Sequence, residues 1–500
     1  MGSSASHSYD SGHVQHDLQL LCASKQSRKK GEQQNEETVR KAFVRLRSHL
    51  APAALTAQQR MVAITRVDQQ RFATWNPEMC ATTDATNRTA AIAQLSDCMR
   101  GLLFGAALGD AMGVNTEFLS KQEVQQYYGS TNVSFRPMMQ HVFPDDHRVM
   151  FCLGDWTDDT DQLILVLQSL LEHEGRFASW EDCCVPHVPA LRTLARKLAH
   201  WARHGFPELG DESAAGLGQS TKKVLNRQDF KGFVDGEHDA CFTAAHDVWV
   251  KSGRTLASNG AVMRTAVCGI PGFRRLDFVR ASTLCACRVT HADPRCQASC
   301  IVVAELVARM LQQSDLIHEG SEALSHEIAN LIQASILSGR KVLEEACEQN
   351  SIEDGLKLSH LQDFDYYLPQ QVLVHGNLDS SIEASVAMLA QLRLDNVQEG
   401  IGYAFKCAGA SIWALRHLIL LMERSASSEP SECSMPVSAT LSLLIAEGGD
   451  ADTNATVAGA LLGCYAGFSH GLDRSMLAEM PHAAWLEAWA QKLLVMMGVR

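Results

Sequence analysis

From about residue 90 to the C-terminus, apolar residues recur three and four positions apart, and stretches in which apolar and polar residues alternate are scarce. The first spacing places apolar side chains on one face of a helix, whereas strict alternation would indicate strands. We therefore predict an all-α fold, a compact single-domain helical bundle. The clearest helical patterns cover residues 163–171, 191–201, 301–311, 389 onward, 412–422 and 441–445.

The first 90 residues lack this regularity. Residues 1–35 are rich in Ser, Gln, His and Lys, which predicts a disordered tail. Residues 36–90 have a charged, moderately amphipathic pattern that Pro52 interrupts, and we interpret them as a helical appendage or linker. The domain that carries the function is then residues 91–500. Within it, residues 350–378 and 425–436 are interpreted as surface segments that interrupt the helical pattern.

Two series of glycines, each with a spacing of four residues, lie in segments that are otherwise apolar. On a helix, positions four apart share a face, so each series leaves a groove without side chains. A glycine inside a helix costs about 1 kcal/mol relative to alanine, so the repetition indicates a close approach of two backbones. Glycine-punctuated loops are the alternative. The series are Gly101, Gly105, Gly109 and Gly113, and Gly459, Gly463, Gly467 and Gly471.

Composition narrows the class of protein. A net charge of −13 argues against general nucleic-acid binding, and 46% hydrophobic residues exclude a wholly disordered chain. Sixteen scattered cysteines without a secretory signal predict reduced thiols and a cytoplasmic protein. The pairs Cys183/Cys184 and Cys285/Cys287 lack the C-x-x-C spacing of a zinc site. The longest uncharged stretch, 455–472, is rich in glycine, which indicates a buried helix and not a membrane span.

The N-terminus has a second interpretation. Its first residues, Met-Gly-Ser-Ser-Ala-Ser, match the N-myristoylation pattern, and the basic cluster Lys25, Arg28, Lys29 and Lys30 could supply the second signal that stable attachment requires. Weak membrane association through a lipid is one hypothesis. A plain disordered tail or a cloning remnant is the other.

The two densest acidic clusters of the chain each lie directly before an apolar segment: the predicted helix 163–171 and the second glycine series. Residues 154–161 contain four aspartates, and residues 448–454 contain Asp450, Asp452 and Asn454. Asp and Thr are good helix caps, but one cap needs one such residue. Four carboxylates within seven positions repel one another, and a bound hard cation with oxygen ligands relieves that repulsion.

The residue types favour magnesium, manganese or calcium, because no Cys or His pattern accompanies the carboxylates. An EF-hand is excluded, since Ala455 stands where the loop requires glycine and Leu461 where it requires glutamate. If both clusters face one site, Asp158, Asp159, Asp450 and Asp452 bring four negative charges, which two divalent ions would neutralise. The sequence therefore predicts a two-metal site.

Five motifs, in this order, make the chain resemble the ADP-ribosylglycohydrolases, which include the dinitrogenase-reductase-activating glycohydrolase. The resemblance extends from about residue 98 to near the C-terminus. The motifs are the glycine-rich run 105–113 followed by Glu117, Thr-Asp-Asp-Thr at 157–160, Ser-Asn-Gly-Ala-Val-Met-Arg at 258–264, Thr-His-Ala-Asp-Pro at 290–294 and Gly-Asp-Ala-Asp-Thr at 449–453.

This resemblance implies a compact all-α domain with two Mg²⁺ ions, for which Mn²⁺ could substitute, that cleaves the bond at the anomeric carbon of the distal ribose of ADP-ribose. Glu117 would be the acid/base or water-orienting group. Ala451 replaces the first threonine of the family's usual Asp-Thr-Asp-Thr motif, at a position that is not an expected ligand. The metal ligands implied are Thr157, Asp158, Asp159, Asp450, Asp452 and Thr453.

The resemblance also implies substrate contacts, each with a plain structural alternative. The Gly216–Gly218 loop could approach a diphosphate through its amides, or it is simply a flexible loop. Ser258, Asn259 and Gly260 have the composition of an Asn-Gly turn. His291 precedes Asp293-Pro294, a natural helix start, and could be a structural histidine.

Three functions remain open at this point. The first is a magnesium-dependent hydrolase that acts on an ADP-ribosylated protein or a small ADP-ribosyl conjugate. The second is a non-catalytic ADP-ribose-binding relative, and the third is a two-metal phosphohydrolase of nucleotide diphosphates. The sequence does not choose among arginine, serine, an ester or a nucleic-acid end as acceptor, and a monomer is favoured as the oligomeric state.

Overall fold

The computed structural model describes residues 16–17, 19–21, 38–43, 85–129, 133–139, 141–314, 322–369, 381–426 and 435–499. Across these ranges the regular structure is helical, with two isolated β-bridges, Ala178 to Pro186 and Ser258 to Tyr403. The predicted all-α fold is confirmed. The α-helices are α4 (Ala85–Gly113), α5 (Lys121–Tyr128), α6 (Asp158–Glu172), α7 (Val188–His204), α8 (Gln219–Leu225), α9 (Gln228–Asp235), α10 (Thr243–Lys251), α11 (Val262–Thr265), α12 (Leu276–Arg288), α13 (Pro294–Gln312), α15 (Glu322–Gln349), α16 (Asp354–Tyr367), α18 (Ile382–Gln391), α19 (Ala404–Ala426), α20 (Pro436–Ile445), α21 (Ala451–Ala466), α22 (Phe468–Gly471), α23 (Arg474–Glu479) and α24 (Ala483–Met497).

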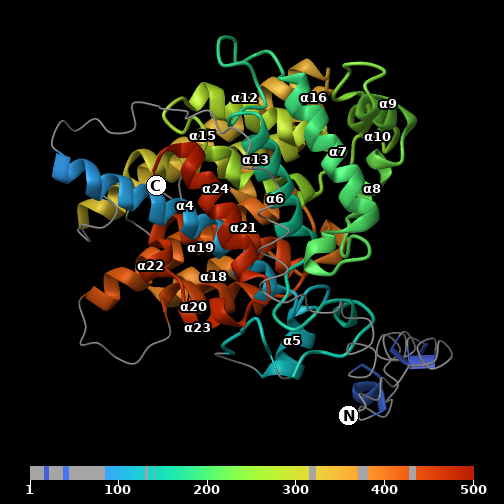
Figure 1. Ribbon diagram of the computed structural model, residues 1–500. Coiled ribbons are helices and arrows are strands. Elements are labelled where there is room, and N and C mark those ends of the chain that lie inside the picture. The colour runs from blue at the N-terminus through green and yellow to red at the C-terminus, as the bar shows by residue number, and fades with distance from the viewer. Residues whose placement is uncertain are drawn as a thin grey trace, which may run out of the picture.

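Helices α4 and α21 lie against each other in the core (Figure 1). A Cβ atom on Gly105 would lie 2.1 Å from the carbonyl oxygen of Gly459, and one on Gly463 would lie 2.0 Å from that of Gly101. The close approach expected from the two glycine series is therefore confirmed. The second series is not one helical face, however. Helix α21 ends at Ala466, and Gly467 adopts a left-handed φ of 78° that a residue with a side chain rarely takes.

The remaining helices surround this pair. Helix α19 and helix α20 pack against α21, and α13 packs against α15 and α19. The helices expected at 163–171, 191–201, 301–311, 412–422 and 441–445 lie within α6, α7, α13, α19 and α20. Helix α19 is long and apolar enough to cross a membrane, but 78% of its apolar window is buried inside the protein, as in a core helix.

Two interpretations of the sequence need correction. The helix expected from 389 onward is wrong, because α18 ends at Gln391 and the chain turns through Arg393 with a left-handed φ of 48°. Residues 354–367, within the proposed surface segment 350–378, form α16. This helix buries Phe364 while Leu358 faces solvent, so its apolar residues do not make the regular stripe that would have identified it.

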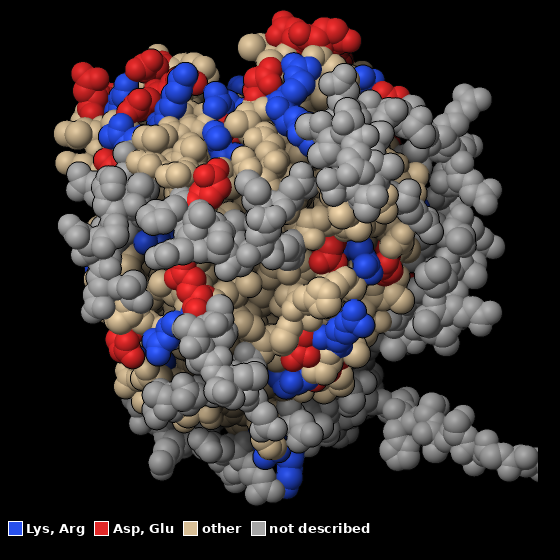
Figure 2. Space-filling model, turned by 90° about the vertical axis from the view of Figure 1, so that its left-hand side faces the viewer, with Lys and Arg blue, Asp and Glu red and all other residues tan. Residues whose placement is uncertain are grey.

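Other predictions fall largely outside the described residues. These are the tail at 1–35, most of the appendage at 36–90, residues 370–378 of the first surface segment and residues 427–434 of the second. Helix α4 already begins at Ala85. On the face shown in Figure 2, the described Lys and Arg side chains are interleaved with Asp and Glu.

Candidate functional site

Asp110 organises the start of helix α6. Its carboxylate, on α4, accepts hydrogen bonds from the main-chain N–H of Thr157 (3.1 Å) and of Thr160 (2.9 Å). The hydroxyls of the same two threonines also donate to it, at 2.9 and 2.6 Å. Free N–H groups at a helix N-terminus favour a carboxylate, so Asp110 joins α4 to the first turn of α6. Thr157 is the N-cap, as its residue type indicated.

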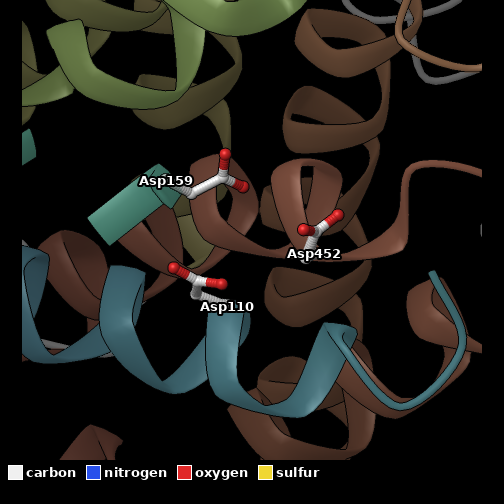
Figure 3. Close-up of side chains that lie close together, drawn as sticks. All are labelled: Asp110, Asp159 and Asp452. Atoms are coloured by element: carbon white, nitrogen blue, oxygen red, sulfur yellow. The ribbon is translucent and has the colours of Figure 1, made fainter. Parts of the chain in front are cut away.

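Three carboxylates from three helices meet at this point. Oxygen atoms of Asp110, Asp159 and Asp452 lie within 4.8 Å of one another, and all three residues are buried. Figure 3 shows them side by side on α4, α6 and α21. Threonine hydroxyls support the group: Thr453 donates to Asp159 at 3.1 Å, and the Thr157 hydroxyl, which donates to Asp110, lies 3.4 Å from Asp452.

A second carboxylate group shares Asp452 with the first. Oxygen atoms of Glu117, Asp450 and Asp452 also lie within 4.8 Å of one another. Glu117 follows α4 and precedes Phe118, whose φ of 61° is unusual for a residue with a side chain. The Phe118 N–H donates to the carbonyl of Gly449 at 2.6 Å, which ties the Glu117 turn to the loop that carries Asp450.

Burial makes these carboxyl groups resist ionisation. Desolvation raises the pKa of Asp158 to about 7 and that of Asp110 to about 6. Desolvation, then the charge of neighbouring carboxylates, raises the pKa of Asp159, Asp452 and Glu117 well above the usual range.

These carboxylates fit divalent cations. The Oδ1 atom of Asp452 is buried and has no hydrogen-bond partner. A cation with oxygen ligands would satisfy this atom and neutralise the repulsion around it. The two carboxylate groups could therefore bind metal ions.

The predicted glycine loop reaches the same place. Asp158 accepts a hydrogen bond from the Gln162 amide at 2.7 Å and one from the main chain of Gly218. A Cβ atom on Gly216, whose φ is +84°, would lie 2.6 Å from Oδ1 of Asp158. A side chain at Gly216 would therefore collide with this carboxylate.

The Ser258–Gly260 segment reaches the site from another side. The Asn259 amide donates to Asp450 at 2.8 Å. Ser258 and His291 are hydrogen-bonded through Oγ and Nε2 at 3.1 Å, and a Cβ atom on Gly260 would touch the His291 ring at 3.2 Å. Burial lowers the pKa of His291 to about 3, so this imidazole is neutral near pH 7.

A cavity of about 850 Å³ opens next to these residues. The main-chain N–H of Asn259 donates to the Gly402 carbonyl at 3.0 Å, and both Ser258 and Gly402 line the cavity. A Cβ atom on Gly402 would lie 2.8 Å from Asp450, so one wall residue of the cavity lies next to a carboxylate of the second group. Its walls include Arg295, Tyr367, Arg393 and Tyr403.

The structure thus brings together all the predicted residues, from segments far apart in the chain, while their individual roles stay predictions. Sequence reasoning missed Asp110 and His147, whose Nε2 is hydrogen-bonded to the Glu117 carboxylate. Asp110 could have been found, because a lone carboxylate inside an apolar helix requires a buried partner. His147 gave no such signal. The sequence did indicate the start of α13, where Asp293 caps the helix and Pro294 is its first residue.

The model of the family described as ADP-ribosylglycohydrolase matches residues 91–500. The chain belongs to this family. Membership in the ADP-ribosylglycohydrolase family supports a hydrolase.

Similar proteins include an uncharacterized protein of Archaeoglobus fulgidus, 25% identical over 48% of this chain and 63% of its own length. The uncharacterized protein YegU of Escherichia coli is 26% identical over 42% and 53%. The ADP-ribosylarginine hydrolase Tri1 of Serratia proteamaculans is 26% identical over 41% and 44%. Each match covers less than two thirds of the relative. A solved ADP-ribosylglycohydrolase-related protein complex matches 81% of this chain and 99% of its own, at 20% identity and a TM-score of 0.46.

Proposed function

We propose that this protein is a divalent-cation-dependent hydrolase that releases ADP-ribose from an ADP-ribosylated protein side chain or a related conjugate, by cleaving the bond at the anomeric carbon of the distal ribose. The observation that carries the proposal is the pair of carboxylate groups that share the buried Asp452 and lie next to a wall residue of a cavity, Gly402. Family membership supplies the chemical class.

The residues that would hold two magnesium ions, or two manganese ions in their place, come from the two acidic segments of the chain, 157–159 and 450–453. When bound, such ions neutralise the carboxylates and hold the vicinal hydroxyls of a ribose while charge develops at its anomeric carbon. These residues are Thr157, Asp158, Asp159, Asp450, Asp452 and Thr453.

Glu117 is the residue that would move a proton in this proposal. Burial and the Asp450 charge raise its pKa above the ordinary value, and its carboxyl group would exchange a proton with the leaving group or the attacking water. In the proposed site the ADP part of the substrate lies in the 850 Å³ cavity, where its diphosphate can meet the amides near Ser258 and Gly402. Asn259 then orients Asp450 through its amide.

The test is product analysis with a panel of defined ADP-ribosyl linkages: arginine, serine, acetyl ester and nucleic-acid end. We expect intact ADP-ribose from at least one linkage, and no turnover with chelator. Asp450→Ala should lose most activity, whereas Asp354→Ala, an exposed acid on α16, should keep it. AMP plus ribose phosphate would instead identify a phosphohydrolase. Tight ADP-ribose binding without turnover on any linkage would identify a binding protein.

A further inference from the structure

The N-terminal part of the chain contacts the segment 141–151, which we call the strap. Leu21, Val39 and Phe43 are buried together with Val142 and Val149 of the strap, in an apolar cluster separate from the main core. Figure 1 shows the short N-terminal helices near α5. Arg40 adds a polar contact, with Nη2 at 3.2 Å from Nδ1 of His141. The N-terminal residues therefore cover one side of the strap.

The other side of the strap holds Glu117. His147 is hydrogen-bonded through Nε2 to the Glu117 carboxylate. The neighbouring Arg148, which is buried, donates to the main-chain oxygens of Glu117 and, at 2.9 Å, of Asn115. Val149 directly follows these two residues. One short helical turn thus faces the N-terminal cluster with Val149 and faces Glu117 with His147 and Arg148.

Different contacts hold the main chain and the side chain of Glu117. Its main chain is fixed by Arg148 and by the bond between Phe118 and Gly449. Its side chain lies close to the carboxylates of Asp450 and Asp452. The Arg148 charge attracts the Glu117 carboxylate, and His147 contributes a direct side-chain hydrogen bond to it. Loss of His147 would remove the hydrogen bond that sets the direction of the carboxyl group, while the contacts to the backbone stay.

We propose that the described N-terminal residues, 19–21 and 38–43, which we call the N-terminal segment, support the active site. By packing on Val142 and Val149 they fix the position of the strap. The strap in turn holds His147, which orients the Glu117 carboxyl group. His147 is then a positioning residue. Its catalytic consequence rests on the proposed function, in which Glu117 transfers a proton. The contact between the N-terminal segment and the strap does not depend on the proposed function.

The first experiment separates positioning from folding. With the linkage that the wild type cleaves, we expect His147→Ala to lower kcat about 10- to 100-fold while KM changes less than about threefold, since substrate binding uses other residues. His147→Gln, whose amide can donate to Glu117, should recover a large part of kcat. Unchanged kcat in His147→Ala, or equal losses in both variants, would overturn the role of His147.

The second experiment tests the N-terminal segment in the full chain. Val39→Ala combined with Phe43→Ala should lower kcat in the same way, and should have no further effect in a His147→Ala background, because both changes act through one contact. Leu358→Ala, a similar truncation at an exposed site on α16, is the control. Losses that multiply in the combined variant would overturn the pathway. Arg40→Ala, at an exposed position, gives a milder change should the double variant fail to fold.

Hydrogen exchange gives a readout that does not need activity. The amides of residues 141–151 should exchange faster in the Val39→Ala, Phe43→Ala variant than in wild type, while those of α21 should not change. Unchanged exchange in the strap would overturn the proposal whatever the kinetics. A wild type without turnover would refute the proposed function and the role of His147, and exchange would still decide whether the N-terminal segment fixes the strap.

Discussion

Gly105 and Gly459 face each other across α4 and α21 with no room for a methyl group between them. A Cβ atom on Gly459 would lie 2.0 Å from the carbonyl oxygen of Gly105. This contact lets two helices from opposite ends of the domain meet at backbone distance. Asp110 on α4 and Asp452 on α21 reach the same carboxylate group as a result.

Gly105→Ala should destabilise the protein by about 1–3 kcal/mol, because the new methyl group must push backbone and not a flexible side chain. Helix propensity alone gives the opposite sign, a gain of about 1 kcal/mol. Chemical denaturation would measure the difference. Gly355→Ala is the matched control: it lies in α16, a Cβ there meets nothing within 4 Å, and we expect no loss of stability.

Asp452→Asn should separate activity from stability. Asp452 belongs to both carboxylate groups, so we expect cation affinity and turnover to fall at least about 100-fold. In chelator the same variant should unfold at a temperature no lower than wild type, since a neutral amide removes the desolvation and repulsion that raise the Asp452 pKa. Calorimetric titration with Mg²⁺ and thermal unfolding in chelator give the two numbers. A variant that bound Mg²⁺ like wild type would show that Asp452 is not a ligand.

Asp110→Asn should weaken cation binding about 10- to 100-fold and cost about 1–3 kcal/mol of stability, because two N–H groups and two hydroxyls lose their carboxylate acceptor. Asp161→Asn is the control, because Asp161 is a buried aspartate in the first turn of α6, the turn that Asp110 contacts. Asp161 accepts from the indoles of Trp156 and Trp201, both at 2.9 Å, so its loss should lower stability and leave cation affinity unchanged. Equal affinities in the two variants would contradict the role of Asp110.

The stability of the metal-free protein should depend on pH with a definite sign. Burial raises the pKa of Asp158 to about 7 and that of Asp110 to about 6, from 3.8. Between 3.8 and these values the folded state binds more protons than the unfolded chain, so stability falls as the pH rises through this window. A bound cation offsets that penalty. The increase in Tm that Mg²⁺ produces should therefore be larger at about pH 8 than at about pH 5.5, and the reverse order would contradict these shifts.

The sequence predicted the parts of this protein that depend on local pattern. Helical spacing placed α6, α7, α13, α19 and α20, and glycine spacing predicted the close approach of α4 to another helix. It failed where tertiary contacts decide the outcome. Helix α16 has no regular apolar stripe, and α18 ends at a turn that packs Leu392 and Leu394 into the core.

The candidate site shows the same division. Residue types and motif order indicated Asp158, Asp159, Asp450 and Asp452, because each lies in an acidic cluster of the sequence. His147 becomes meaningful only when the strap lies over Glu117, and that arrangement depends on contacts between segments that no local pattern encodes.

Thr157 and Asp452 touch at 3.4 Å although 295 positions separate them in the chain. During synthesis, the residues of α4 and α6 that contribute to the two carboxylate groups therefore leave the ribosome long before those of α21 are made. Until α21 is synthesised, Asp110, Asp158 and Asp159 lack the carboxylate of Asp452 beside them. The glycine groove on α4 also lacks the helix that packs into it. A product that ends before residue 450, through a premature stop codon or proteolysis, keeps most of the mass of the domain. It lacks Asp452, however, and so can form neither carboxylate group.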